Sequence, residues 1–235
     1  MKGKSSLWAA AVIAVSIIVL GFCLKAGIDR FSDRDRVVTV RGLCEKEVKA
    51  NKVTWPVVTN EVGNDLVAIY SKIKANNEAI IAFLTANGLS ESEISVNPPA
   101  VYDQMSDRYN SNTSPFRYQV TNVLVVTSEK VDLVQSLIRK QTELMQQGIA
   151  VVMGGYNYPT VYEYTDLNAI KPEMIAEATV KAREAAEKFA SDSKSRLGAI
   201  RTASQGQFSI SDRDQYTPDI KSVRVVTTIT YSLCD

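Results

Sequence analysis

Hydrophobic residues in residues 37–235 follow two spacings, one typical of strands and the other typical of helices. Runs of β-branched or every-second apolar residues predict strands near residues 37–40, 48–62, 94–96, 116–127, 149–164, 200–210 and 222–233. Apolar positions three and four residues apart predict three helices between these strands. Each predicted helix ends at a glycine able to adopt the left-handed conformation, namely Gly88, Gly148 and Gly198. The predicted order is β-β-α-β-β-α-β-α-β-β.

Strands that occur both in pairs and between helices favour an α+β fold. We expect a mainly antiparallel sheet, or sheets, with three helices packed on one face and built from βαβ-like modules. Pro56 lies within the second strand and cannot donate a ladder hydrogen bond, so this strand is predicted to be an edge or bulged strand. The third helix is rich in alanine, and its inner face is predicted to contain Met174, Ala178, Ala182, Ala185 and Phe189.

An apolar segment precedes this body. Residues 7–24 are almost entirely apolar, and a helix of this length spans about 27 Å, close to the ~30 Å hydrocarbon core of a bilayer. Lys2 and Lys4 precede the segment, as in a signal sequence. We expect an uncleaved signal-anchor over residues 1–24, with a cleaved signal and a lipoprotein signal as alternatives. The rest of the chain is then a polar tether over residues 25–36 and one domain over residues 37–235.

This layout predicts a single-pass protein of the cell membrane whose C-terminal domain is extracytoplasmic, and periplasmic in a Gram-negative cell. The positive-inside count opposes that orientation, because basic residues also lie on the C-terminal side of the segment: Lys25, Arg30, Arg34 and Arg36. The short basic leader at the extreme N-terminus nevertheless favours export of the C-terminal domain.

Composition excludes several classes of activity. The 235 residues contain no histidine, which rules out Ser-His-Asp or Cys-His catalysis and histidine-containing zinc or haem sites. With 27 Lys+Arg against 26 Asp+Glu, the charge gives no reason to expect nucleic-acid binding. The glycines form no phosphate-binding loop. We therefore expect no enzymatic activity and no cofactor.

Five short motifs in order resemble the SIMPL-domain family. One of them, residues 117–122, resembles the strand after the family's variable loop. Residues 37–42 resemble its "I-T-V-x-G-x-G" entry, although Cys44 replaces the second glycine, and residues 47–53 match the next stretch without its Pro-Asp. Residues 83–94 resemble "L-K-x-x-G-I-x-x-x-D-I". Residues 178–198 resemble the helix "A-x-x-x-A-R-x-x-A-x-x-x-A-x-x-L-G", which is the most specific match. The resemblance implies an exported α+β domain that tends to form homo-oligomers, has no established enzymatic activity and carries over no catalytic residues.

Tyrosines draw attention in the fifth predicted strand. Their even spacing in a continuous strand would put all four on one face: Tyr156, Tyr158, Tyr162 and Tyr164. Such a face is a candidate interface, because tyrosine is enriched where proteins bind one another. Packing of the same face beneath a helix, or cross-strand aromatic pairing within the sheet, is the alternative, and we favour it.

Two loops are rich in acidic residues and amides. Calcium could use their oxygens, but neither has the spacing of an EF-hand and basic residues lie beside both, so ordinary turn composition explains them better. The loops contain Asp103, Asp107, Asn110 and Asn112, and Asp212, Asp214 and Asp219.

Cysteines occur at three positions. Cys23 lies in the apolar segment, whereas Cys44 and Cys234 lie near strand ends in the exported body. Export would permit a disulfide between the latter two, with free thiols as the default. These patterns leave two candidate functions: a membrane-anchored, self-associating envelope protein with a structural or stress-related role, or an extracytoplasmic module that binds a peptide, glycan or partner protein.

Overall fold

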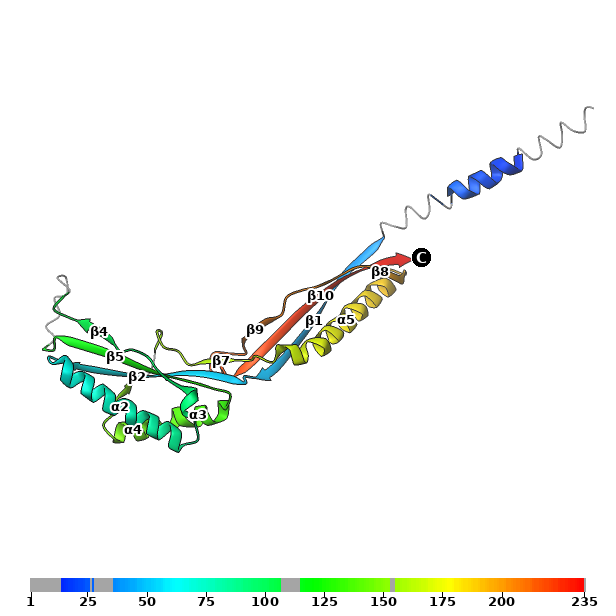
Figure 1. The fold of residues 1–235 in the computed structure, drawn as a ribbon. Helices are drawn as coiled ribbons and strands as arrows, with labels where there is room; N and C mark the ends of the chain where they lie inside the picture. Colours follow the sequence, from blue (N-terminus) through cyan, green and yellow to red (C-terminus); the bar gives the residue numbers. More distant parts are fainter. Residues whose placement is uncertain (1–13, 26, 28–35, 107–114, 153–154, 235) are drawn as a thin grey trace, which may run out of the picture. The chain divides into compact units, whose positions relative to one another are not determined.

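The structure is a computed structural model that describes residues 14–25, 27, 36–106, 115–152 and 155–234. The chain divides into two compact units, and each has its own sheet (Figure 1). Unit 1 comprises the described residues of 1–46, 168–209 and 223–235, and unit 2 comprises those of 47–167 and 210–222. The single domain expected over residues 37–235 therefore contains two units.

A helix covers residues 14–25 within the apolar N-terminal segment. Among the described residues, no helix has both the length and the apolar character needed to cross a membrane. Residues 1–13 of the expected anchor, and residues 26 and 28–35 of the expected tether, lie outside the described residues.

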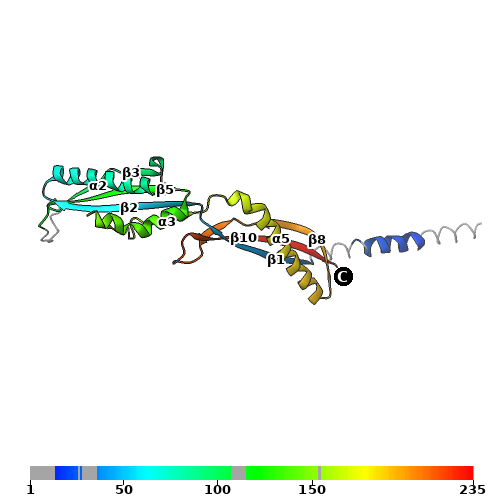
Figure 2. The same cartoon turned by 90° about the horizontal axis from the view of Figure 1, so that it is seen from below.

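Unit 1 is an antiparallel sheet with one long helix along it (Figures 1 and 2). β1 (Val37–Lys49), β10 (Ile220–Cys234) and β8 (Arg196–Gln205) lie in the order β1-β10-β8, and β9 (Ser209–Asp212) pairs with β10. β8 runs antiparallel to β10, with Ala203 opposite Ile229. α5 (Leu167–Asp192) covers one face of this sheet.

Small side chains form the contact between α5 and the sheet of unit 1. The buried positions of α5 are four residues apart and form one ridge along the helix: Met174, Ala178, Ala182, Ala186 and Ala190. The first three confirm the predicted inner face. Ala185 is only half-buried and Phe189 is 61% exposed, so the predicted end of that face is wrong. The ridge instead continues through Ala186 and Ala190. Their small side chains fit the narrow space between α5 and the sheet, whereas the side chain of Phe189 would not.

Unit 2 is built around the long pair β2 (Lys52–Gly63) and β5 (Tyr118–Ser128), with Val57 opposite Leu124. Two short strands, β3 (Ile94–Val96) and β4 (Ala100–Asp103), pair with β5. Two more, β6 (Val151–Val152) and β7 (Val161–Glu163), pair with β2. The helical elements are α2 (Leu66–Ala86), the short η2 (Glu91–Glu93), α3 (Val131–Lys140) and α4 (Thr142–Gln146).

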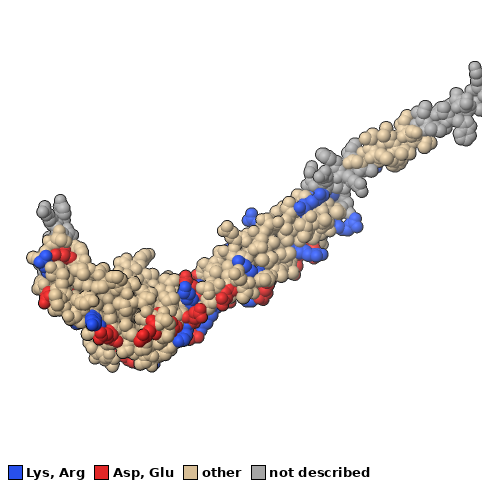
Figure 3. Space-filling view, in the orientation of Figure 1, with Lys and Arg blue, Asp and Glu red and all other residues tan. Residues whose placement is uncertain are grey.

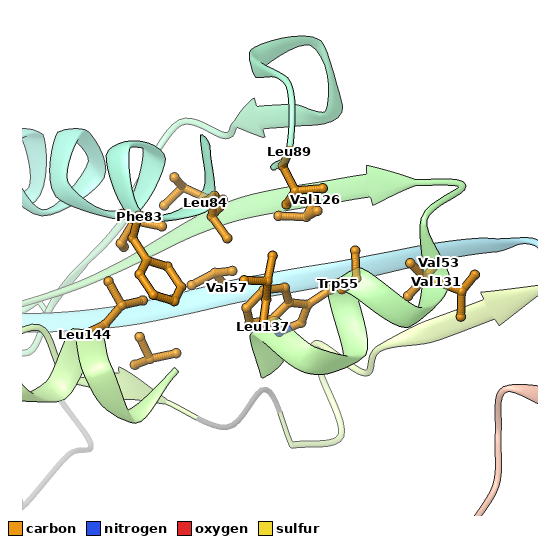
Figure 4. Packing of buried hydrophobic residues seen from close by; sticks show 14 of the residues in the cluster. Val53, Trp55, Val57, Phe83, Leu84, Leu89, Val126, Val131, Leu137 and Leu144 are labelled. Atoms are coloured by element: carbon orange, nitrogen blue, oxygen red, sulfur yellow. The ribbon is translucent and has the colours of Figure 1, made fainter. Parts of the chain in front are cut away.

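The core of unit 2 lies between this sheet and helices α2, α3 and α4 (Figures 2 and 4). Alternate residues of the central strands point toward the helices, as the period of a strand requires. They meet apolar residues from each helix, and the resulting cluster includes Val53, Trp55, Val57, Phe83, Leu84, Leu124, Val126, Val134, Leu137 and Leu144. Trp55 is a packing residue of this core and is 4% exposed.

The mixed fold with antiparallel sheets is confirmed, but α2 to α5 are four helices where the sequence predicts three. The predicted helix over 128–148 is divided at Gln141, whose backbone N–H donates to the carbonyl of Ile138 at 3.5 Å. This tighter turn separates α3 from α4. Both parts still contribute to one core, through Leu137 and Leu144.

Pro56 does not mark an edge strand, because β2 has partners on both sides. β7 pairs with residues 52–54 and β6 with residues 58–59, so residues 55–57 fall in the gap between these two short strands. The missing N–H of proline is tolerated at this gap, although β2 is central.

Two of the three predicted helix-ending glycines are confirmed. Gly88 (φ 103°) and Gly148 (φ 81°) both have left-handed backbones after a helix. Gly198 instead lies within β8, and Lys194 (φ 54°) takes the left-handed position after α5. A side chain at Gly198 would lie 2.5 Å from Ser232 Oγ. This glycine therefore permits close strand packing and does not end a helix.

Candidate interaction sites

The four tyrosines of the predicted interface do not share a face. Residues 155–157 form a turn, in which Gly155 has a φ of 52°, so no continuous strand runs through this region. Tyr156 is fully exposed in the turn, whereas Tyr162 lies in β7 and is only 9% exposed within the core of unit 2. Tyr158 and Tyr164 are half-buried. The packing alternative is therefore correct for Tyr162 alone.

Tyr158 and Tyr156 instead belong to a hollow on the face of the unit 2 sheet opposite the helices. The hollow has a volume of about 320 Å³, and the turn shares it with Val58, Thr121 and Val152. Val58 pairs with Val123 and Val152, and is 3% exposed.

Tyr162 lines a second hollow, of about 350 Å³, on unit 2. Its hydroxyl forms a hydrogen bond with Gln135 of α3, and burial raises its pKa. The remaining lining side chains come from the end of α3 and from the loop between β9 and β10: Ile138, Arg139, Tyr216, Pro218 and Asp219. We call this the α3 hollow. Sequence analysis did not single out Arg139 or Tyr216, because each becomes notable only through its neighbours in the folded chain.

Asp214 organises the loop that contributes Tyr216 and Pro218. Its carboxylate accepts hydrogen bonds from the backbone N–H groups of Tyr216 and Thr217, both at 2.8 Å. Arg213 Nε donates to the same carboxylate at 3.0 Å. The hydrogen bonds from Thr217 and Arg213 hold the pKa of Asp214 well below its usual range. The loop is thus fixed by a group that sequence analysis considered only as part of an acidic cluster.

Acidic residues of both loops form ion pairs with neighbouring cations, although within the described part of the chain Asp219 does not. Asp103 pairs with Arg117 at 2.9 Å, which lowers the pKa of Asp103, and Asp212 pairs with Lys221. Within the described residues, no group of three or more acidic or cysteine side chains is placed to hold a metal ion. Asp107, Asn110 and Asn112 lie outside those residues.

Cys44 and Cys234 are both free thiols, so the alternative of a disulfide between them is not realised. The N–H of Leu233 donates to the carbonyl of Arg36 at 2.8 Å, which places the end of β10 beside the start of β1. Cys44 is eight residues further along β1, or about 26 Å, whereas a disulfide requires α-carbons within about 7 Å. Cys44 is instead buried against α5, where its thiol donates to Glu177 at 3.2 Å.

Both outer strands of the unit 1 sheet have a free edge. Among the described residues, β8 and the part of β1 in unit 1 each pair only with β10. β8 has ten residues, nearly all of them exposed, and Ile200 is 55% exposed. It contains two charged residues, Arg196 and Arg201, and no proline or lysine. Natural sheets commonly protect such edges with lysine, proline or very short strands.

Charge does not gather into one large area on the face shown in Figure 3, where Lys and Arg lie beside Asp and Glu. Some charged residues form ion pairs along a single element, such as Glu177 with Lys181 and Arg183 with Glu187 on α5. Exposed pairs of this kind contribute little to stability.

Comparison with known protein families gives a match over most of the chain. The family model SIMPL, described as a protein of unknown function (DUF541), matches residues 38–231. The chain belongs to the SIMPL family. The matched residues run through both units, so the SIMPL region of this chain comprises two sheets. A search of the curated proteins finds no match to this chain.

Two segments on which the SIMPL resemblance rests pack against each other in unit 1. Gly42 of the opening motif lies against the backbone of α5 at Ala178 and Ala182, which belong to the alanine-rich motif. A side chain at Gly42 would overlap that backbone. The two motifs therefore form the two sides of one contact between strand β1 and helix α5.

Proposed function

We propose that this protein is a non-catalytic, membrane-tethered protein of the cell envelope that associates with copies of itself through the free edge of β8. The observation that carries this proposal is the long, weakly protected edge of the unit 1 sheet. Along that edge, backbone N–H and C=O groups face away from the sheet, and a strand of another copy can complete the ladder.

The composition of β8 favours pairing over repulsion. Eight of its ten residues are uncharged, and the residues near its C-terminal end are small or hydroxylated: Thr202, Ala203 and Ser204. The chain as a whole has a formal charge of +1, so long-range repulsion between copies is weak. A free edge with these properties supports an ordered assembly in a protein confined to a surface.

Residues 7–24 supply the tether in this proposal. Their apolar length suits a bilayer, and the preceding lysines suit a signal-anchor. The apolar side chains of the helix over 14–25 are exposed, with Phe22 at 70% and Ile17 at 63%. Anchoring would concentrate the units in two dimensions, and this concentration strengthens weak edge pairing by mass action.

The absence of histidine throughout the chain supports a non-catalytic role, because it removes the commonest general base. Function in the proposal therefore depends on assembly and attachment.

Adjacent proline substitutions test the proposed edge. Neighbouring residues of an antiparallel strand direct their backbone N–H groups to opposite sides. Of the two variants Thr202→Pro and Ala203→Pro, one therefore removes a hydrogen bond to β10, and the other removes a backbone N–H donor at the free edge. The full-length protein in detergent should form oligomers by sedimentation velocity. One variant should melt at a lower temperature, and the other should dissociate while its melting temperature changes little. Oligomers of unchanged mass in both variants would rule out β8 as the interface.

A further inference from the structure

We infer that the α3 hollow of unit 2 is a binding site for a small zwitterion of the free α-amino-acid type, with an aromatic or aliphatic side chain. This inference goes beyond the self-association proposed above and does not depend on it, because every lining residue belongs to unit 2.

Two opposite charges line this hollow without neutralising each other. Arg139 and Asp219 both face it, and within the described residues neither side chain has an ion-pair partner. Elsewhere in unit 2 some charged residues are paired, such as Lys49 with Asp132 and Lys72 with Glu61. Tyr162 lines the same hollow, and Asp219 raises the pKa of its hydroxyl whereas Arg139 lowers it. A cation and an anion that line one hollow match a ligand that carries both charges.

The lining between these charges combines polar and apolar surface. Tyr216 is 84% exposed and stands at the mouth as an open aromatic surface, and Pro218 and Ile138 continue it. Tyr162 and Gln135 supply a hydroxyl and an amide at the hollow. Its volume of about 350 Å³ is at the small end of ligand pockets, which suits one amino acid and not a long chain.

The recognition elements are fixed before a ligand arrives. Asp214 holds the backbone at Tyr216, and the carbonyl of Asp219 accepts a hydrogen bond from the N–H of Ala50 at 2.7 Å. Arg139 lies in the last turn of α3, whose buried face is anchored in the core by Leu137. Preorganised groups lose little entropy on binding, so a shallow site of this kind can still select its ligand.

Chemical complementarity assigns each group a role. The guanidinium of Arg139 binds the α-carboxylate of the ligand, since its planar donors fit two oxygens. The carboxylate of Asp219 accepts hydrogen bonds from the α-ammonium group. The ligand side chain packs on Tyr216 and Pro218. A simple anion would leave Asp219 facing like charge, and a neutral sugar would leave both charges unmatched.

Ligand-observed NMR on the full-length protein in detergent tests this site. L-phenylalanine should show saturation transfer with a dissociation constant in the millimolar range or below. N-acetyl-L-phenylalanine lacks the ammonium charge and L-phenylalaninamide lacks the carboxylate, and each should bind at least about tenfold more weakly. N-acetylglucosamine should give no signal. No binding of L-phenylalanine, equal binding of the blocked derivatives, or preferential binding of the sugar would overturn the inference.

Charge-neutralising variants locate the binding. Arg139→Gln and Asp219→Asn should each weaken L-phenylalanine binding at least about tenfold, and circular dichroism should show an unchanged fold. Lys140→Gln and Glu143→Gln are matched controls, because both residues are exposed near the same helix ends but do not line the hollow, and they should bind as the parent does. Unchanged binding in Arg139→Gln, whose exposed side chain is not needed for folding, would overturn the assignment.

Discussion

A β-carbon placed on Gly42 would lie 1.8 Å from the carbonyl oxygen of Ala178. It would also lie 2.6 Å from the backbone nitrogen of Ala182. Both neighbours are helix backbone, which cannot move aside as a flexible side chain can. β1 and α5 therefore touch backbone to backbone at this point, and unit 1 depends on glycine there.

Gly42→Ala should destabilise unit 1 severely, by at least the ~1–3 kcal/mol that overpacking costs. Thermal unfolding of the full-length protein, followed by circular dichroism, measures the loss. Gly63→Ala is a matched control, because its new methyl group would meet only the side chain of Ile69, at 3.3 Å. Equal shifts in melting temperature for the two variants would show that the strand–helix contact is looser than described.

Ala182→Leu should be more harmful than Lys181→Leu. Ala182 is fully buried against the unit 1 sheet, so the added volume overpacks the contact at a cost of about 1–3 kcal/mol. Lys181 is exposed and forms an exposed ion pair with Glu177, so its replacement should change stability by less than about 1 kcal/mol. Denaturant unfolding compares the two. A larger loss for Lys181→Leu would contradict the buried face of α5.

The face of α5 shows how far sequence patterns reach. Met174, Ala178 and Ala182 could be predicted because helical spacing and small size agree at these positions. The end of the face could not be predicted in this way, because hydrophobicity favours Phe189 as a buried residue whereas the contact with the sheet requires a small side chain. The close approach of α5 to the sheet at Ala178 and Ala182 depends on Gly42, and that glycine lies more than a hundred residues away in sequence.

Acid should destabilise unit 2 through Glu93. Its carboxylate accepts hydrogen bonds from Ser128 Oγ at 2.6 Å and from the N–H of Ser90 at 2.8 Å, and these lower its pKa from 4.5 to about 2. Because the folded pKa lies below the unfolded one, the stabilisation is complete above about pH 5 and is lost as the pH falls toward 2. Its size is at most about 3 kcal/mol, since one pKa unit corresponds to about 1.36 kcal/mol.

Glu93→Gln should therefore remove part of the acid sensitivity. Urea unfolding at pH 7 and pH 3 should show a smaller stability difference for this variant than for the parent protein. Glu91→Gln changes an exposed carboxylate beside it and should retain the full difference. If both variants keep the parent's pH dependence, the Glu93 hydrogen bonds do not contribute as described.

Cys234 should react with a thiol reagent more than about tenfold faster than Cys44 in the folded protein. Cys234 is exposed, whereas Cys44 is buried and its pKa is raised, first by that burial and then by its hydrogen bond to Glu177. Labelling at pH 8 in a Cys23→Ser background, followed by peptide mapping, separates the two sites. Both should react equally in urea. Fast labelling of Cys44 without denaturant would contradict its packing against α5.

The tyrosines and Pro56 show where sequence analysis fails. An even spacing predicts one face only if the strand is continuous, and the turn at residues 155–157 breaks it. Pro56 predicts an edge strand only if every backbone N–H of a central strand must form a hydrogen bond with a neighbouring strand. Pro56 lies at the gap between β6 and β7, where its missing N–H is tolerated. The α3 hollow joins Arg139 to Asp219 across eighty residues, a proximity that no local pattern contains.

The mass of the full-length protein in detergent, measured by light scattering after size exclusion, tests the proposed self-association most directly. After correction for bound detergent, the protein mass should be a multiple of 25.9 kDa, and it should rise with concentration. A lysine at the free edge, Ala203→Lys, should return it toward that of a single chain, whereas Glu187→Lys on the exposed side of α5 should not. A protein mass of 25.9 kDa at every concentration would contradict assembly through β8.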